Sequence, residues 1–372
     1  MQRIITAEEN YKGLDKWLEG KKNVLLVCDD SIKYLSAFNQ KLEGISTPIV
    51  RFSGFKPNPL YESVVAGVKV YREKQCDSII AVGGGSAIDV AKCIKLYTTE
   101  DGDGSDGMWL KSDITPNTIP FLAMPTTAGT GSEATRYAVV YFEETKQSIT
   151  SESLIPETVL FDPNVLKTLP IYQKKATMCD ALCHAIEAFW SVNSTNESKA
   201  YSREAIKGVL DNMEGYLSNT EVGNAGMLRA AHTAGKAINI TQTTAGHAMC
   251  YKITSLFNIA HGHAAMLCDR ILFKWMIENT DRCTDSRGED YIKTTLDEIG
   301  VALGCENART GADCLERIFN TLELSVPESD GYKFEQLNSS VNITRLRNHP
   351  IELNKLTIDE LYHKILKYNG NR

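Results

Sequence analysis

Apolar runs and helix-periodic stretches alternate through the first half of the chain. The run "NVLLVCDD" at residues 23–30 is rich in Val and Leu, which is typical of a strand buried on both faces of a parallel sheet. Similar strand candidates occupy residues 47–55, 77–86 and 119–132, and residues 61–76 place Val and Tyr at helical spacing. This alternation of strand and helix predicts a doubly wound α/β domain.

The second half of the chain has a different pattern. From about residue 166 onward the segments are long and helix-periodic, with few strand signals. Pro163 and Pro170 interrupt the chain where the pattern changes. We therefore predict two domains, an α/β domain at residues 1–165 and an all-helical domain at residues 166–372.

Composition narrows the class of protein. A chain of 372 residues, 42% hydrophobic and 23% charged, is long enough for two globular domains. Its net charge of −7 argues against nucleic acid or an anionic membrane surface as the main partner. The ten cysteines show no CxxC pair, which predicts reduced thiols in the cytoplasm. We see no signal peptide and no apolar run of about 18 residues, so we expect no membrane span.

The stretch "AVGGGSAID" places Gly83, Gly84 and Gly85 between a strand and a helix. Glycine lets the backbone approach a phosphate closely, and the free N–H groups of a helix N-terminus favour negative charge. Ser86 and Asp89 follow in the first turn of the predicted helix. The alternative is a tight strand-to-helix turn that binds no ligand.

A second glycine turn, "PTTAGTGSEAT" at residues 125–135, also follows an apolar strand. Its hydroxyl groups can donate hydrogen bonds to phosphate or sugar oxygens: Thr126, Thr127, Thr130 and Ser132. Two such turns in one parallel sheet predict a dinucleotide that lies across the carboxyl ends of the strands.

Two acids, Asp29 and Asp30, end the first strand candidate. An acid in this place can bind ribose hydroxyls and repel a 2′-phosphate, which favours NAD over NADP. The alternative is a solvated acid that caps the next helix.

Asp180 and His184 are one helical turn apart and lie opposite an apolar stripe in "TMCDALCHAIEAFW". A carboxylate and an imidazole at this spacing can both reach one divalent ion. The alternative is an acid–histidine pair on a solvated helix face.

His247 and His261 are fourteen residues apart. On one straight helix they would lie roughly 21 Å apart, too far to share an ion. They converge only if the helix breaks between them, and the segment "KITSLFNIA" contains Asn and β-branched residues that permit a break.

Five ordered stretches resemble the signature blocks of the iron-containing (group III) alcohol dehydrogenases: "PNPLYESVVAGV", "AVGGGSAIDVAKCI", "IPFLAMPTTAGTGSEAT", "DALCHAIEAF" and "GHAMCYKITSLFNIAHGHA". The resemblance covers about Asn58 to Ala265. It implies an N-terminal dinucleotide-binding α/β domain, a C-terminal helical domain, and an active site between them.

The resemblance also implies two sets of site residues. The implied metal ligands are Asp180, His184, His247 and His261. The implied cofactor contacts are Asp29, Asn58, Gly84, Gly85, Ser86, Asp89, Thr126, Thr127, Thr130 and Lys146.

The implied chemistry is that of an NAD(P)-dependent oxidoreductase. A divalent ion polarises an aldehyde carbonyl, and the nicotinamide gives hydride to the carbonyl carbon. The family usually uses Fe²⁺, and the same ligands accept Zn²⁺ or Mn²⁺. We expect NAD(H) to be preferred over NADP(H), and a homodimer or larger homo-oligomer.

Two positions depart from the usual pattern of the family. Tyr251 replaces a second histidine, and His263 follows the fourth ligand, so we name both as candidate catalytic residues. The sequence of the stretch from His247 to Ala265 resembles that of a branch of the family that reduces phosphonoacetaldehyde, an anionic aldehyde. Arg136, Lys252 and His263 would suit a phosphonate or a sulfonate, and the alternative is that these cations are surface charges.

Other activities remain open at this stage. The enzyme alternatives are a reductase of sulfoacetaldehyde or of a neutral short-chain aldehyde, and a non-redox enzyme of the dehydroquinate synthase kind, which shares the architecture. A protein that binds metal and NAD without turnover is the alternative outside enzymes.

Overall fold

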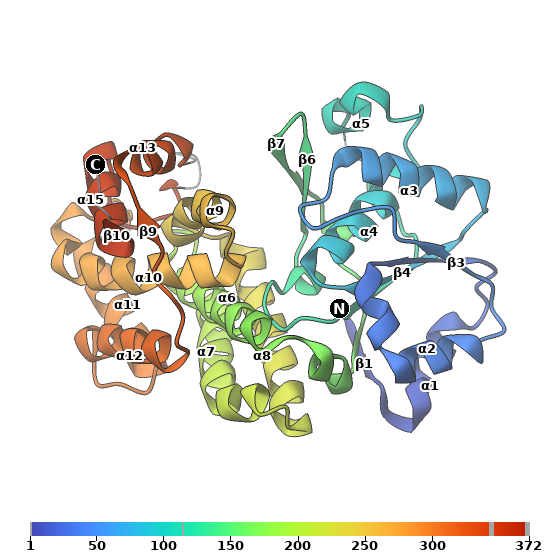
Figure 1. Ribbon diagram of the computed structural model, residues 1–372, viewed down its shortest axis with the longest axis horizontal. Helices are drawn as coiled ribbons and strands as arrows, with labels where there is room; N and C mark the ends of the chain where they lie inside the picture. Colours follow the sequence, from blue (N-terminus) through green and yellow to red (C-terminus); the bar gives the residue numbers. More distant parts are fainter. Residues whose placement is uncertain (1, 114, 342–345, 369–372) are drawn as a thin grey trace. The chain divides into compact units, whose positions relative to one another are not determined.

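The computed structural model describes residues 2–113, 115–341 and 346–368. The chain forms two compact units, Met1–Leu169 and Pro170–Arg372, which we call the sheet unit and the helical unit (Figure 1). The division lies close to the boundary predicted between residues 165 and 166. Among the described residues, no helix is both long and apolar enough to cross a membrane.

The sheet unit is built on a parallel sheet, which has six strands within the described residues. In spatial order they are β1 (Arg3–Thr6), β8 (Thr158–Phe161), β5 (Phe121–Pro125), β4 (Ser78–Gly83), β2 (Val24–Cys28) and β3 (Ile49–Phe52). Every residue of β2, β4, β5 and β8 is buried, as expected for strands covered on both faces. The predicted doubly wound α/β fold is confirmed.

Helices cover both faces of this sheet. In Figure 1, α3 and α4 lie on one side and α1 and α2 on the other. The helices of this unit are α1 (Glu8–Leu18), α2 (Ser36–Glu43), α3 (Tyr61–Glu73), α4 (Gly85–Tyr97) and α5 (Met108–Lys111). Short 3-10 helices connect the elements: η1 (Asp30–Tyr34), η2 (Ser105–Gly107), η3 (Ser132–Ala134), η4 (Glu152–Leu154) and η5 (Pro163–Thr168).

An antiparallel hairpin, β6 (Tyr137–Phe142) and β7 (Thr145–Thr150), extends the sheet unit beyond the prediction. Buried residues of the hairpin, Val140 and Ile149, join the core formed by α3, α4 and the sheet. The hairpin therefore packs beside the helix that follows the first glycine turn.

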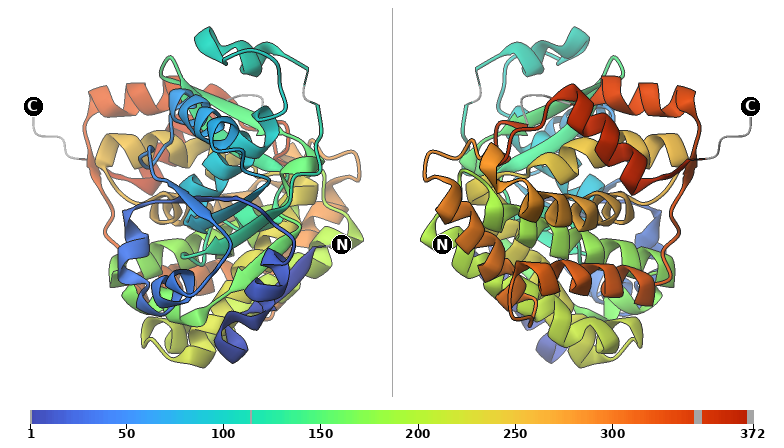
Figure 2. Two further views of the ribbon diagram at one scale, coloured as in Figure 1. Left: turned by 90° about the vertical axis from the view of Figure 1, so that its right-hand side faces the viewer. Right: turned by 90° about the vertical axis from the view of Figure 1, so that its left-hand side faces the viewer.

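The helical unit surrounds one central helix. Its helices are α6 (Ile171–Trp190), α7 (Asn196–Leu217), α8 (Glu221–Thr241), α9 (Ala245–Phe257), α10 (His261–Glu278), η6 (Thr280–Arg282), α11 (Glu289–Ala302), α12 (Ala308–Thr321), α13 (Gly331–Ser340) and α15 (Lys355–Ile365). Figure 2 (right) views this unit from the side of its last helices. Helix α6 packs against α7, α8 and α10, and each of its residues from Met178 to Trp190 is buried.

The prediction of an all-helical second domain was incomplete. Two short strands, β9 (Glu328–Ser329) and β10 (Lys367–Tyr368), pair in parallel within it. Segments of two residues are too short to show a period in the sequence.

Candidate metal centre and cofactor-binding turns

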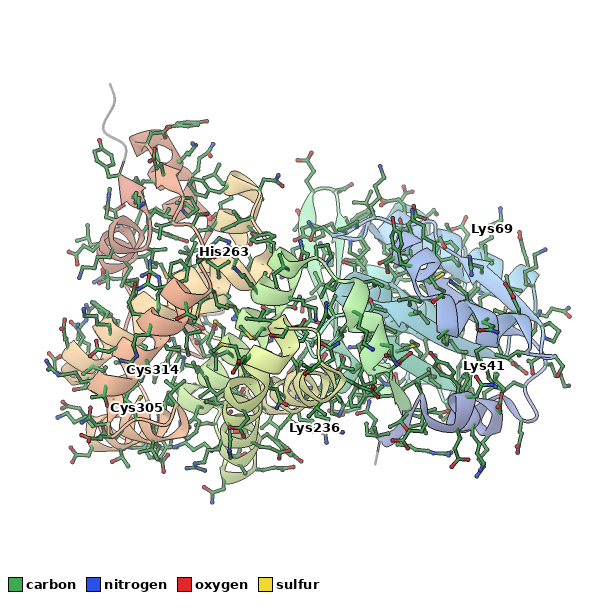
Figure 3. The ribbon with its side chains drawn as sticks, turned by 60° about the horizontal axis from the view of Figure 1, so that its bottom comes forward. Lys41, Lys69, Lys236, His263, Cys305 and Cys314 are labelled. Atoms are coloured by element: carbon green, nitrogen blue, oxygen red, sulfur yellow. The ribbon has the colours of Figure 1, made fainter. Side chains whose placement is uncertain are left out.

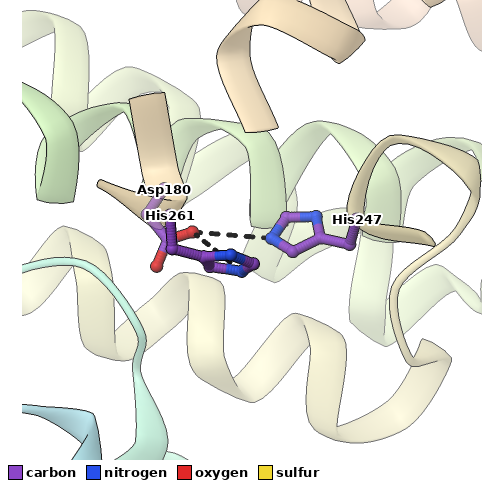
Figure 4. Close-up of side chains that lie close together, drawn as sticks. All are labelled: Asp180, His247 and His261. Carbon is purple, nitrogen blue, oxygen red and sulfur yellow. Dashed lines mark ion pairs between the residues drawn. The ribbon is translucent and has the colours of Figure 1, made fainter. Parts of the chain in front are cut away.

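Three of the predicted metal ligands converge in the helical unit. Asp180 Oδ1 lies 3.5 Å from His247 Nε2 and 3.9 Å from His261 Nε2 (Figure 4). One ligand atom from each residue lies within 4.8 Å of the others. Asp180 and His247 are buried, whereas the side chain of His261 is 34% exposed, so the group opens to solvent on the His261 side. The three residues come from three different helices, α6, α9 and α10.

The fourth predicted ligand, His184, lies beside this group. It is buried one turn after Asp180 on α6, and its ring stacks on His247 with centroids 4.4 Å apart. The alternative of a solvated acid–histidine pair is wrong, because α7, α8 and α10 pack against α6 and both Asp180 and His184 are buried.

The helix break predicted between the two histidines is confirmed. His247 lies in the first turn of α9, and His261 is the first residue of α10. Between the helices, Asn258 adopts a left-handed backbone with φ of 50°, a conformation that Asn tolerates better than most residues. The chain thus reverses within a few residues and returns His261 to the group.

Gly262 lets α10 approach α6 closely. A Cβ atom at this position would lie 2.0 Å from the carbonyl oxygen of Ala176 and 2.7 Å from the backbone nitrogen of Asp180. Any larger residue would push the start of α10 away from the helix that carries Asp180. The glycine therefore sets the distance between two of the ligands.

Opposite charges balance within this buried group. Burial by itself would raise the pKa of Asp180, but the neighbouring imidazoles of His184, His247 and His261 hold it well below its ordinary value. Burial would lower the pKa of His247, yet the carboxylates of Glu187 and Asp180 raise it to about 10. The site therefore favours one more positive charge beside Asp180.

The donor set fits a divalent transition metal ion. Asp180 Oδ1 and His247 Nε2 are buried and have no hydrogen-bond partner among the described residues, which is rare for buried polar atoms. A carboxylate with three imidazoles is a ligand set that Fe²⁺, Zn²⁺ and Mn²⁺ accept. A cation between these atoms would complete bonds that the protein leaves unmade.

Glu187 was missed in the sequence and contacts the cluster directly. It is fully buried on α6, and its Oε1 accepts hydrogen bonds from the backbone nitrogen of His247 at 2.9 Å and from His247 Nδ1. Its Oε2 accepts from Thr244 Oγ1 at 2.6 Å and from the Thr244 nitrogen. The available signal was its spacing, since Glu187 follows Asp180 by seven residues and therefore lies on the same helix face.

A second buried acid, Asp269, lies against Glu187. One oxygen from each carboxylate and one nitrogen of His247 form a group within 4.8 Å. Burial and the charge of Glu187 raise the pKa of Asp269 well above its ordinary value. Burial would also raise the pKa of Glu187, but His247 lowers it to about 2. The pKa values of the two acids thus shift in opposite directions, downward for Glu187 and upward for Asp269.

The two candidate catalytic residues lie in different surroundings. The ring of Tyr251 stacks on His261 with centroids 5.1 Å apart, beside the cluster and partly exposed. His263 is buried inside the helical unit (Figure 3). Its Nδ1 lies 3.1 Å from the hydroxyl of Tyr172, and its Nε2 donates to the Ser325 carbonyl at 2.9 Å.

These contacts indicate a structural role for His263. The Tyr172 hydroxyl also accepts from the backbone nitrogen of Ala260 at 2.9 Å, so the network ties the start of α10 to α6. Both ring nitrogens of His263 are engaged, and burial lowers its pKa. This geometry does not fit the predicted catalytic role, and we assign His263 no step in the reaction.

The two glycine turns of the sheet unit meet in space. They follow β4 and β5, which are adjacent and parallel. A Cβ at Gly84 would lie 3.4 Å from Thr127 Oγ1, and one at Gly85 would lie 3.1 Å from Thr130 Oγ1. Gly84 caps α4, so the free N–H groups of that helix start beside the threonine hydroxyls. The arrangement suits a pyrophosphate at the helix N-terminus.

The remaining predicted cofactor contacts surround these turns. Asp29 Oδ1 caps η1 through the Ser31 nitrogen at 2.8 Å, as the alternative interpretation expected. Its Oδ2 faces the first turn, 3.4 Å from where a Cβ of Gly83 would lie. The predicted contacts Ser86 and Thr126 lie within the two turns themselves.

Three further predicted contacts lie near the hairpin. The Asp89 carboxylate accepts hydrogen bonds from Ser132 Oγ at 2.6 Å and from the Val139 nitrogen at 3.0 Å, so it joins α4 to the second turn and to β6. Burial raises the pKa of Asp89, and the charge of Lys146, on β7, offsets part of that rise. Asn58 is exposed, with φ of 56°, just before the segment that bridges to β6.

The two predicted substrate cations differ in their engagement. Arg136, in the sheet unit, forms an ion pair with Glu152 at 2.6 Å and donates from Nε to the Tyr137 hydroxyl. Its charge is therefore balanced by the protein, which weakens the case for anion binding. Lys252 follows Tyr251 on α9 and is partly exposed.

Comparisons with known proteins agree with this architecture. The family model described as iron-containing alcohol dehydrogenase matches residues 2–163, and the model of the C-terminal part of the Fe-containing family matches residues 174–366. Alcohol dehydrogenase 4 of Schizosaccharomyces pombe is 31% identical and aligns over 81% of this chain and 70% of its own length. 1,3-Propanediol dehydrogenase of Klebsiella pneumoniae is 32% identical, over 72% of each chain.

Two further matches concern anionic aldehydes. Phosphonoacetaldehyde reductase of Streptomyces viridochromogenes is 28% identical over 81% of this chain and 79% of its own. The crystal structure of sulfoacetaldehyde reductase from Bifidobacterium kashiwanohense in complex with NAD⁺ superposes with a TM-score of 0.88, covering 98% of this chain and 97% of that one. At 23% identity, this second match shows the fold alone.

Proposed function

Because the chain belongs to the iron-containing alcohol dehydrogenase family, an oxidoreductase family that acts on CH–OH groups, we propose that it reduces a small aldehyde to a primary alcohol with NADH. The observation that carries this proposal is the convergence of Asp180, His247 and His261, with His184 beside them. The preference for NADH rests on Asp29 beside the first glycine turn.

The proposed metal ligands are Asp180, His184, His247 and His261. Fe²⁺, or Zn²⁺ or Mn²⁺ in its place, supplies a Lewis acid that polarises the aldehyde carbonyl when bound. The protein contributes the rest of the site. Glu187 and Asp180 keep His247 in place, and the exposed side of His261 leaves an approach for substrate.

Tyr251 is the proposed proton donor. Its ring stacks on that of His261, the ligand whose side chain is partly exposed. A phenol can donate a hydrogen bond to the substrate oxygen and hand over a proton as the alcohol forms. We propose that it takes the place of the imidazole expected at this position in the family.

The test is an assay of NADH oxidation with purified protein. The metal-free protein is loaded without oxygen with Fe²⁺, Zn²⁺ or Mn²⁺ and supplied with propanal, 3-hydroxypropanal, phosphonoacetaldehyde or sulfoacetaldehyde. We expect turnover that needs the metal and is faster with NADH than with NADPH. If no aldehyde is reduced although metal and NADH are bound, the proposal fails and a non-enzymatic or non-redox role takes its place.

An anionic aldehyde is the second candidate substrate class. It is favoured by Lys252 next to Tyr251 and by the likeness to phosphonoacetaldehyde reductase. Loss of one charge-assisted contact corresponds to about tenfold in affinity, so Lys252→Ala should raise KM for phosphonoacetaldehyde about tenfold and leave that for propanal unchanged.

Two variants accompany this measurement. Lys274→Ala removes an exposed lysine of α10 in the same unit and should change neither KM. Arg136→Ala should have less effect than Lys252→Ala, because Glu152 already balances the charge of Arg136. Equal effects of Lys252→Ala on both aldehydes would remove the anionic class.

A further inference from the structure

We propose that Glu187 is a positioning residue of the metal centre, which orients His247 so that its Nε2 faces Asp180 and His261. This inference rests on the proposed function, because it takes His247 to be a metal ligand. In this role Glu187 contacts the ligand His247 and contacts neither the metal ion nor the substrate. Its position on α6 lets one buried carboxylate act on a ligand from another helix.

The hydrogen bonds of Glu187 join two helices. Its Oε1 receives the backbone nitrogen and the Nδ1 of His247, and its Oε2 receives the backbone nitrogen and the hydroxyl of Thr244. Thr244 is the N-cap of α9, and His247 lies in the first turn of that helix. The same carboxylate therefore both caps the start of α9 and holds the side chain of His247.

The bond to Nδ1 decides which ring nitrogen is available. When Nδ1 carries the proton and donates it to a carboxylate, the lone pair of a neutral imidazole is on Nε2. In the structure Nε2 lies 3.5 Å from Asp180 Oδ1 and has no hydrogen-bond partner among the described residues. The orientation set by Glu187 is thus the orientation that a metal ion requires.

An amide in place of this carboxylate cannot make the same bonds. The four hydrogen bonds that Glu187 makes with Thr244 and His247 all come from groups that donate, so both of its oxygens must accept. Glutamine offers one oxygen and one NH₂ group. Its NH₂ would oppose either the donors of Thr244 or those of His247, and in the second case it favours the ring tautomer with the proton on Nε2.

The experiment measures metal binding by metal-free protein. Zn²⁺ affinity and stoichiometry are determined by competition with a chromogenic chelator, and the visible spectrum of the Co²⁺ form reports ligand geometry. Changes to residues behind metal ligands typically cost 10–100-fold in affinity, so we expect Glu187→Gln to weaken Zn²⁺ binding by about 10–100-fold and to alter the Co²⁺ spectrum.

The matched control is Glu316→Gln. Glu316 is on α12 of the same unit and accepts two hydrogen bonds from Arg270 at 2.7 and 2.8 Å. It belongs to neither group of possible metal ligands found among the described residues. Both variants should lower the thermal unfolding midpoint of the metal-free protein, but Glu316→Gln should keep the wild-type Zn²⁺ affinity and Co²⁺ spectrum. Equal affinity losses in the two variants would reduce the role of Glu187 to general stability.

The outcomes separate this inference from the proposed function. If the wild type binds no Zn²⁺, the proposed function fails. If the wild type binds one ion and Glu187→Gln binds it equally well, the inference alone is overturned. If the wild type binds two ions and Glu187→Gln loses one of them, Glu187 is a ligand of a second site with Asp269 and the positioning role is wrong.

A second variant covers a failure of Glu187→Gln to fold. Glu187→Asp keeps an acceptor-only carboxylate but shortens the side chain by one methylene group. We expect Zn²⁺ affinity between those of the wild type and of a variant without the carboxylate, Glu187→Ala. If Asp and Ala weaken binding equally, or if neither does, the carboxylate has no orienting role.

Discussion

In the sheet unit, the candidate cofactor site consists of two turns, residues 83–89 and 125–132, that are each continuous in the sequence and follow neighbouring strands. In the helical unit, the metal centre collects side chains from α6, α9 and α10. The first site offers backbone N–H groups and hydroxyls on turns that are partly exposed. The second offers charged and aromatic groups, most of them buried.

This difference predicts how each site responds to change. Donors on an exposed turn can exchange a ligand for water, so the loss of one contact costs only that contact. Buried charges depend on each other, because removing one leaves its partner without compensation. Single substitutions should therefore have larger effects in the helical unit than in the sheet unit.

The largest effect should come from His261→Ala. The variant removes one ligand, so Zn²⁺ affinity should fall by more than the roughly 100-fold typical of residues behind the ligands, and turnover should fall at least about 1,000-fold. Because the His261 side chain is 34% exposed, helical content by circular dichroism should not change. NADH binding, followed by fluorescence, should also be retained.

His363→Ala is the control for this variant. His363 is a partly exposed histidine of α15 that pairs with Asp359 and lies outside the cluster. It should keep metal, turnover and NADH affinity. Stoichiometric metal in His261→Ala would contradict the ligand assignment.

The next largest effect should come from Gly262→Ala. The added methyl group would overlap the carbonyl oxygen of Ala176, 2.0 Å away, and overpacking of this kind costs about 1–3 kcal/mol. The thermal unfolding midpoint should fall by several degrees, and Zn²⁺ affinity by about tenfold or more, because α10 carries His261 away from Asp180.

Gly331→Ala tests whether any glycine of the unit would behave in this way. A Cβ at Gly331, the first residue of α13, would meet nothing within 4 Å. We expect no loss of stability or metal affinity. If Gly262→Ala is equally harmless, the close approach of α10 to α6 does not set the ligand geometry.

The contrast between the two units also explains which features could be predicted from the sequence. Strands β2, β4 and β5 are apolar runs, and a glycine turn follows both β4 and β5, so both the sheet and its turns were visible in the sequence. β1 and β8 were not predicted, because they are short and their place in the sheet depends on pairing between distant segments. The helix break before His261 followed from the distance that metal ligands can span.

The interior of the helical unit was harder to predict. The sequence places Asp180 and His184 on one face of α6, but only the packing of α7, α8 and α10 shows that this face is buried. Asp269 was missed, because its contact with Glu187 joins α10 to α6 and no local pattern marks it. Glu187 was missed although its spacing from Asp180 places it on the same helix face. His263 was misjudged because the sequence does not show that Tyr172 and Ser325 engage its ring.

A smaller effect, confined to the sheet unit, should come from Asp29→Asn. Asparagine can still cap η1, but it no longer repels a 2′-phosphate. We expect the ratio of kcat/KM for NADPH to that for NADH to rise about tenfold, which corresponds to roughly 1.4 kcal/mol. Metal content should stay at the wild-type level, because no ligand of the metal centre belongs to this unit.

Asp30→Asn provides the matched comparison for that measurement. Asp30 is the next residue, and its side chain is 94% exposed in a loose pair with Lys33. It should leave the cofactor preference unchanged. A shift of the same size in both variants would indicate a general effect of net charge, and no shift in Asp29→Asn would remove Asp29 from the cofactor site.

The last expected effect is a pH dependence of the metal-free protein. Burial alone would lower the pKa of His247, but the carboxylates of Glu187 and Asp180 outweigh it. The pKa of His247 is therefore about 10 in the folded protein, against 6.5 for the free side chain. A group whose pKa is raised on folding stabilises the fold fully below the unfolded value. This contribution should therefore be lost as the pH rises from about 6.5 to about 10.

The unfolding midpoint of the metal-free protein should fall by a few degrees over this range, beyond any change seen in His247→Asn, which lacks the titrating ring. With Zn²⁺ bound, Nε2 is occupied by the ion in place of a proton, so the loss should disappear. Zn²⁺ affinity should rise with pH over the same window, because binding releases the proton of His247. Identical pH profiles of the metal-free wild type and His247→Asn would show that His247 carries no extra proton in the fold. The charge balance that distinguishes the helical site from the glycine turns would then have to rest on the carboxylates alone.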